Sequence, residues 1–74
     1  MPGSEFFVLI HAGDTTGVVE ELLRVHGLTP EAAGIHRLMY VTRANQTLLM
    51  ARDDAAPIVP LLLDRGWEAP GRDG

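Results

Sequence analysis

The chain of 74 residues contains no cysteine, and its only serine is Ser4. Without cysteine it forms no disulfide, binds no metal through thiolates and has no cysteine nucleophile. A single serine so close to the start gives no basis for a Ser-His-Asp set. Asp53 and Asp54 stand directly before an apolar stretch, where a helix cap explains them better than an acid/base pair. The sequence therefore shows no catalytic centre, and we do not expect an enzyme.

Lysine is also absent. The chain has six arginines and ten acidic residues, which gives a net charge of −4. Attraction to phosphates supplies most non-specific nucleic-acid affinity, so an acidic chain is a poor nucleic-acid binder. No apolar run approaches the ~18 residues that indicate a membrane-spanning helix. A secretory signal has a basic segment followed by an apolar one, and the sequence shows no such pattern. We expect a cytoplasmic protein with neither a nucleic-acid nor a membrane partner, and we predict no cofactor.

Hydrophobic residues make up 46% of the chain, which is enough for a core. A chain of this length buries only about 60–65% of the surface that it exposes when unfolded, so its stability is marginal. Extra stability then has to come from good packing or from self-association. We predict a single domain over residues 6–69, with a flexible N-terminus or tag remnant at 1–5 and a flexible tail at 70–74.

The hydrophobic pattern predicts a strand, a helix, two strands joined by a hairpin, and a second helix, over residues 6–12, 18–26, 35–43, 46–52 and 55–65. Apolar spacing defines the first helix, and Gly27 ends it. Thr29 and Pro30 begin a short helical connector. Pro60 is costly inside a helix, so the second helix starts late or bends. Residues 67–69 offer a brief fourth strand.

This order of elements fits an α+β ferredoxin-like sandwich, in which two helices cover one face of an antiparallel sheet. In that arrangement the first and third strands are central and the second lies at an edge. Both central strands are apolar on both faces, since Val8 and Ile10 alternate with Leu9, and Leu48 alternates with Leu49. Monomers rarely expose a large apolar patch. We therefore predict a homodimer or higher homo-oligomer.

The best candidate for a ligand site is the turn from Gly13 to Gly17, which joins the first strand to the first helix. Glycine lets a backbone approach a ligand closely. A helix N-terminus suits a carboxylate, and Asp14 suits an ammonium group, so the turn matches a small amino acid. The alternative is that Asp14 and Thr15 only cap the helix, while the glycines make the turn.

Three histidines, His11, His26 and His36, raise the question of a metal site. No two of them have the i, i+4 spacing of a helical metal motif, so we predict no metal and interpret them as surface or interface residues. His11 adjoins the turn and is the histidine best placed to touch a ligand. An enzyme that acts through His11 at a subunit contact stays a further alternative.

Two motifs give the chain a resemblance to ACT domains. One is Asp14-Thr15-Thr16-Gly17-Val18, which is similar to the Asp-x-x-Gly-hydrophobic turn of that family. The other is a helix that begins after Asp53-Asp54 and ends at Gly66-Trp67. The chain departs from the family pattern at Thr16, where a proline often stands, and in a longer connector over residues 28–34.

The resemblance implies a regulatory module that binds a small amino acid or related carboxylate at a subunit interface. It adds a neighbour's strand to the site, so that the predicted ligand-binding residues are His11, Gly13, Asp14, Thr15, Thr16, Gly17, Val18, Met39, Tyr40 and Val41. The last three have the alternative of packing at a subunit contact. A pure assembly domain with no small ligand is the alternative for the whole protein.

Overall fold

The computed structural model describes residues 6–70, so the predictions for residues 1–5 and 71–74 lie outside the described part. The described chain runs through β1 (Phe7–Ala12), α1 (Thr16–Val25), α2 (Pro30–Ala33), β2 (Ile35–Val41), β3 (Gln46–Ala51) and α3 (Ile58–Leu63). The predicted order of elements is confirmed. The connector before β2 contains the short helix α2, which Thr29 caps by accepting a hydrogen bond from the N–H of Ala32 (3.1 Å).

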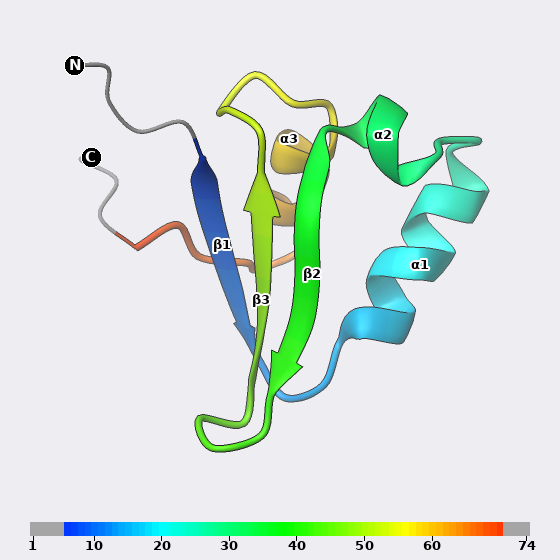
Figure 1. Ribbon diagram of the computed structural model, residues 1–74. Helices are drawn as coiled ribbons and strands as arrows, with labels where there is room; N and C mark the ends of the chain where they lie inside the picture. Colours follow the sequence, from blue (N-terminus) through cyan, green and yellow to red (C-terminus); the bar gives the residue numbers. More distant parts are fainter. Residues whose placement is uncertain (1–5, 71–74) are drawn as a thin grey trace, which may run out of the picture.

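The three strands form an antiparallel sheet in the order β1-β3-β2 (Figure 1). β2 lies at an edge, as predicted. On the outer side of β1 there is one bridge, in which Ile10 and Glu68 exchange two backbone hydrogen bonds of 2.8 and 2.9 Å. The expected fourth strand is therefore a single bridge. Of the two strands expected in the centre, only β3 is paired along its length on both sides.

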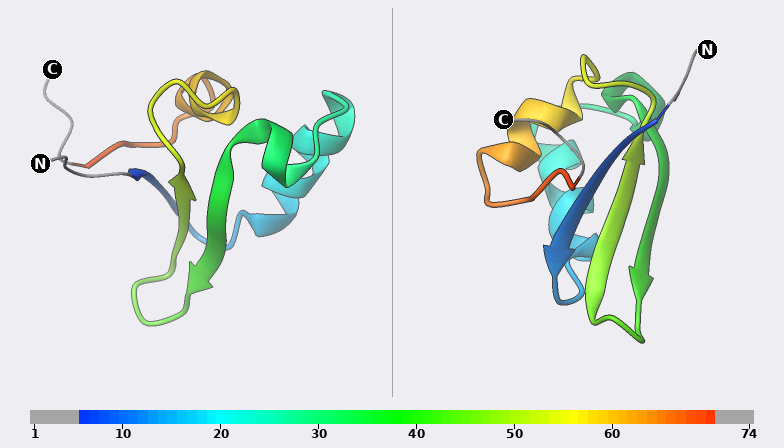
Figure 2. Two further views of the ribbon diagram at one scale, coloured as in Figure 1. Left: turned by 45° about the horizontal axis from the view of Figure 1, so that its top comes forward. Right: turned by 90° about the vertical axis from the view of Figure 1, so that its left-hand side faces the viewer.

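α1 and α3 lie on the same side of the sheet, and Figure 2 shows this in its side view. We call that side the helix-side face. Strand register places three rows of side chains on it: Phe7–Ala51–Ile35, Leu9–Leu49–Leu38 and His11–Thr47–Tyr40. Two rows are apolar and pack in the core, where Leu9 and Leu49 are fully buried. The third row is polar and lies at the end of the sheet where α1 begins.

The opposite side of the sheet carries no helix among the described residues (Figure 2). We call it the open face. Its rows, from the same register, are Val8–Met50–Arg37, Ile10–Leu48–Met39 and Ala12–Gln46–Val41. None of these side chains is fully buried, although most are apolar. The prediction that both faces of the sheet are apolar is confirmed, and only one of them is covered.

α3 is shorter than the predicted helix over residues 55–65. Pro57 stands at its N-cap and Pro60 falls in its first turn, where an N–H would have no intrahelical acceptor, so the missing donor costs no helical hydrogen bond. The late start is therefore confirmed. The prediction that the aspartate pair caps this helix is wrong, because the carboxylate of Asp53 instead accepts a hydrogen bond from the N–H of Ala55 (2.8 Å) in the preceding turn. After the helix, Trp67 is buried against the core.

Candidate ligand site at the end of the helix-side face

The turn between β1 and α1 is tied to the central strand by Thr47, which is fully buried. Its hydroxyl accepts a hydrogen bond from the N–H of Thr15 (2.7 Å) and donates one to the carbonyl of Gly13 (2.6 Å). The N–H of Gly13 donates to the carbonyl of Asn45 in the β2–β3 turn (2.7 Å). Residues 45–47, more than thirty positions further along the chain, therefore hold the turn in place.

Asp14 is the residue that caps α1. One oxygen of its carboxylate, Oδ1, accepts from both the N–H and the hydroxyl of Thr16 (3.2 and 2.8 Å). Thr15 occupies the N-cap position, but its side chain makes no capping hydrogen bond. The other oxygen of Asp14 has no hydrogen bond within residues 6–70. The alternative that these residues cap the helix is thus correct for Asp14 and not for Thr15. The second carboxylate oxygen of Asp14 stays available to a cation.

The hydroxyl of Thr15 is an exception to the usual pairing of buried polar groups. Its Oγ1 is buried and has no hydrogen-bond partner, alone among the side-chain oxygen and nitrogen atoms of residues 6–70. Buried polar atoms nearly always have a partner, and an unpaired one costs about 1–3 kcal/mol. An unpaired buried group calls for a structural or functional explanation, and this one lies within the predicted ligand turn.

Gly17 is the second residue of α1 and has no positive φ, and a Cβ built there meets nothing within 4 Å. The fold therefore does not require glycine at this position, where alanine forms a helix better by ~1 kcal/mol. The first N–H groups of a helix have no intrahelical acceptor. Gly17 and Val18 are both exposed, so an anion can approach their N–H groups without meeting a side chain at position 17.

The strand residues predicted to join the site are separated by the pleat of β2. Tyr40 pairs with Thr47 and so shares the helix-side face with the turn, and its hydroxyl donates to the side chain of Asn45 (2.6 Å). Met39 and Val41 lie on the open face. Within one chain the structure therefore brings Tyr40 to the turn and places its two neighbours on the opposite side of the sheet.

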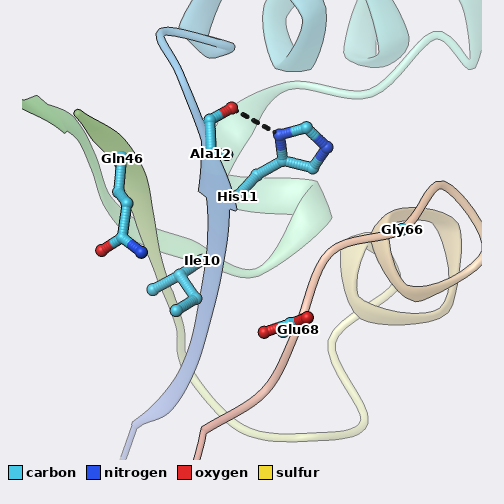
Figure 3. A pocket seen from close by; sticks show the side chains of 6 residues that line it. All are labelled: Ile10, His11, Ala12, Gln46, Gly66 and Glu68. Atoms are coloured by element: carbon cyan, nitrogen blue, oxygen red, sulfur yellow. Dashed lines mark hydrogen bonds between the residues drawn. The ribbon is translucent and has the colours of Figure 1, made fainter. Parts of the chain in front are cut away.

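His11 lines a small pocket of about 210 Å³ at the free edge of β1. Figure 3 shows its ring folded back, so that Nδ1–H donates to the carbonyl of Ala12 (2.8 Å), with Gln46 and Glu68 arriving from separate segments. The centre of the His11 ring also lies 5.3 Å from the centre of the Trp67 ring. His11 is adjacent to the turn in sequence, and its Nδ1–H is already engaged.

No group of three metal-ligating side chains occurs in the described part of the chain. The histidines lie apart: His26 caps the end of α1, and the ring of His36 stacks on Phe6 with 4.3 Å between ring centres. The helices of residues 6–70 are all too short or too polar to cross a membrane.

The sequence interpretation overlooked Thr47, the residue that holds the turn. A signal was present, because Thr47 alternates with Leu49 and Ala51 and so shares their buried face. A lone hydroxyl on an apolar face has to bind a polar partner from elsewhere in the fold. The identity of that partner depends on the strand register and on where the turn lies, neither of which the local pattern shows.

Comparison with protein-family models, with curated proteins and with solved structures finds no match to the chain. The resemblance to ACT domains therefore rests on the two sequence motifs alone. Any functional conclusion has to come from the geometry of the turn and of the sheet.

Proposed function

We propose that the chain is a small-ligand-binding regulatory module that binds an amino acid or a related small carboxylate at the Gly13–Gly17 turn. The observation that carries the proposal is the unpaired buried hydroxyl of Thr15 in the turn that the sequence independently predicts as a ligand site. In this proposal the Thr15 side chain turns to another staggered rotamer when the ligand binds, so that its hydroxyl reaches the ligand. A bound ligand then supplies the missing partner.

The chemistry of the turn matches both ends of an amino acid. The N–H groups of Gly17 and Val18, at the positive end of α1, suit the carboxylate. The free oxygen of Asp14 suits the ammonium group. Tyr40 lies on the same face of the sheet and offers an aromatic side chain to the substituent, so the site needs no residue from another chain. The proposed ligand class follows from these groups.

The fold of this module is proposed to be a ferredoxin-like arrangement with a reduced fourth strand. The order β1-β3-β2 and the bridge of Glu68 to the outer side of β1 support it, because together they give the order of a four-stranded split βαβ sheet. In this proposal the protein acts as a homo-oligomer, as its two apolar sheet faces predict.

The substitution Thr15→Val tests the ligand proposal. It removes the hydroxyl and keeps the shape, so the unliganded protein is expected to be as stable as the original or more stable. Binding of the responsive amino acid, measured by isothermal titration calorimetry, is expected to weaken at least tenfold. Thr29→Val is the matched control, because it removes the capping hydroxyl of α2 and leaves the turn intact.

The first step of the experiment is a thermal-shift screen of the common amino acids and small carboxylates. A ligand at about 100 times its Kd stabilises the folded state by ~2.7 kcal/mol, which corresponds to a rise in Tm of roughly 10–20 °C for a domain of this size. The absence of a shift with every compound contradicts the proposal. Equal binding by the Thr15→Val variant contradicts the role of the hydroxyl.

A pure assembly domain is the second candidate, and the uncovered apolar open face favours it. The variants Asp14→Ala and Gly17→Leu distinguish the two functions. If the protein is only an assembly domain, neither variant changes its oligomeric state, and no small ligand raises the Tm of the unmodified protein.

A further inference from the structure

The open face combines an apolar centre with one unpaired charge on each side. Its middle consists of Val8, Ile10, Met39, Leu48 and Met50, none of which is fully buried. Arg37 stands on this face at the β2 edge, in register with Met50. Glu68 is the bridge partner of Ile10 beyond β1, and directly opposed residues of an antiparallel pair project to the same face.

Neither charge is paired with an opposite charge in the part of the chain that the structure describes. Arg37 and Glu68 are both exposed, and neither side chain forms a hydrogen bond or an ion pair within residues 6–70. β1 and β3 separate them, which makes about 14 Å between the strands that carry them. The two side chains are therefore too far apart to meet in one chain.

We propose that the open face binds the open face of a second copy of this chain, with the two-fold axis parallel to the strands. Rotation about that axis lays β1 of each chain over β2 of the other. It thereby brings Glu68 to the side of the interface where the partner's Arg37 lies, and the reverse contact follows from symmetry. The acid and the base flank the same apolar stripe on opposite sides, so the face is complementary to itself.

Sheets that pack face to face lie about 10 Å apart with their strands within about 30° of each other. That spacing suits the side chains of Leu48, Met39 and Met50, and the unbranched methionines adapt to an imperfect fit. Three strands of six or seven residues cover only ~300 Å², against about 800 Å² for each partner of a standard complex. The dimer is therefore expected to be weak and to depend on concentration.

This dimer does not depend on ligand binding, because the turn lies on the other face of the sheet. It gives Met39 and Val41 a role as contact residues. Pairing of two chains through their β2 edges, which extends the sheet sideways, makes a different prediction, since it keeps Glu68 far from the partner's Arg37.

Sedimentation velocity of the full chain from about 1 μM to about 1 mM provides the test. The unmodified protein is expected to shift from monomer to dimer across that range. Leu48→Glu is expected to abolish the shift, while Val25→Glu, on the exposed side of α1, leaves it unchanged. Circular dichroism and Trp67 fluorescence check that both variants are folded.

Reversing the charges at positions 37 and 68 tests whether the two-fold axis of the dimer is parallel to the strands. Arg37→Glu and Glu68→Arg are each expected to weaken the dimer about three- to thirtyfold, and the double variant is expected to restore it. A protein that stays monomeric at 1 mM overturns the proposal, as does a dimer that survives in the folded Leu48→Glu variant. A double variant as weak as the two single ones overturns the two-fold arrangement.

Discussion

Gly34 is the one glycine of residues 6–70 at which an added methyl group meets another part of the chain. It ends α2 in the left-handed conformation, with φ of 82°. A Cβ built there lies 2.3 Å from the Cβ and 3.2 Å from the Cα of Ala56, which is buried ahead of α3. Carbon atoms in contact prefer about 3.5–4.0 Å. Replacement by alanine therefore forces the start of β2 away from the segment that leads into α3.

The cost of Gly34→Ala has two parts. The left-handed conformation costs a residue with a side chain about 1–2 kcal/mol, and overpacking adds about 1–3 kcal/mol. A more restricted unfolded state returns about 0.4–1 kcal/mol, so the net loss is roughly 1–4.5 kcal/mol. A domain of this length is stable by only about 4–11 kcal/mol at 0.05–0.15 kcal/mol per residue. Urea denaturation followed by the fluorescence of Trp67 measures the loss.

Gly27→Ala is the matched control, because Gly27 also has a positive φ (66°) but its Cβ meets nothing within 4 Å. It is expected to lose only the conformational part. Ala56→Gly in the Gly34→Ala background removes one of the two clashing carbons and is expected to restore part of the stability. Equal losses at Gly27 and Gly34, or no recovery in the double variant, refute the close approach of these two segments.

Three further substitutions and one matched control test the core and the turn through the stability of the folded state. Thr47→Val leaves the N–H of Thr15 and the carbonyl of Gly13 unpaired and is expected to cost ~2–4 kcal/mol in urea denaturation, so a cost below about 1 kcal/mol contradicts the bonding of the turn. Leu62→Ala removes a fully buried side chain and is expected to cost about 2–5 kcal/mol, whereas Val25→Ala, 64% exposed, changes stability by no more than about 0.5 kcal/mol. Similar losses for these two contradict the placement of the core on the helix-side face. Asp14→Ala removes the cap of α1 and is expected to lower the Tm by the equivalent of ~1 kcal/mol, and an unchanged Tm contradicts the capping role.

The order of the elements could be predicted because each one has a strong local signal. The spacing of apolar residues indicates α1, and Gly27 indicates its end. Thr29 and Pro30 indicate the start of α2. Pro60 correctly indicated a late start for α3. The aspartate pair misled, because aspartate caps turns as readily as helices, and only the three-dimensional path shows that a turn intervenes between Asp53 and α3.

The candidate site could be predicted only in part. The Gly13–Gly17 turn is visible in the sequence, since glycine and capping residues cluster there. The partnership of Thr47 with that turn depends on contacts between residues more than thirty positions apart. The separation of Tyr40 from Met39 and Val41 follows from strand register, which a shift of one residue reverses.

Helices close one face of the sheet, and in the proposed dimer a second copy of the chain closes the other. A half-filtered NOE experiment on a mixture of ¹³C-labelled and unlabelled protein near 1 mM tests this arrangement most directly. Ile10 and Met39 lie on opposite sides of β3 within one chain, about 10 Å apart, which is too far for an NOE. Intermolecular NOEs are expected between the methyl groups of Ile10 and those of Met39 in the second copy. Intermolecular NOEs confined to the β2 edge or to the helices, or none at all, contradict the proposed dimer.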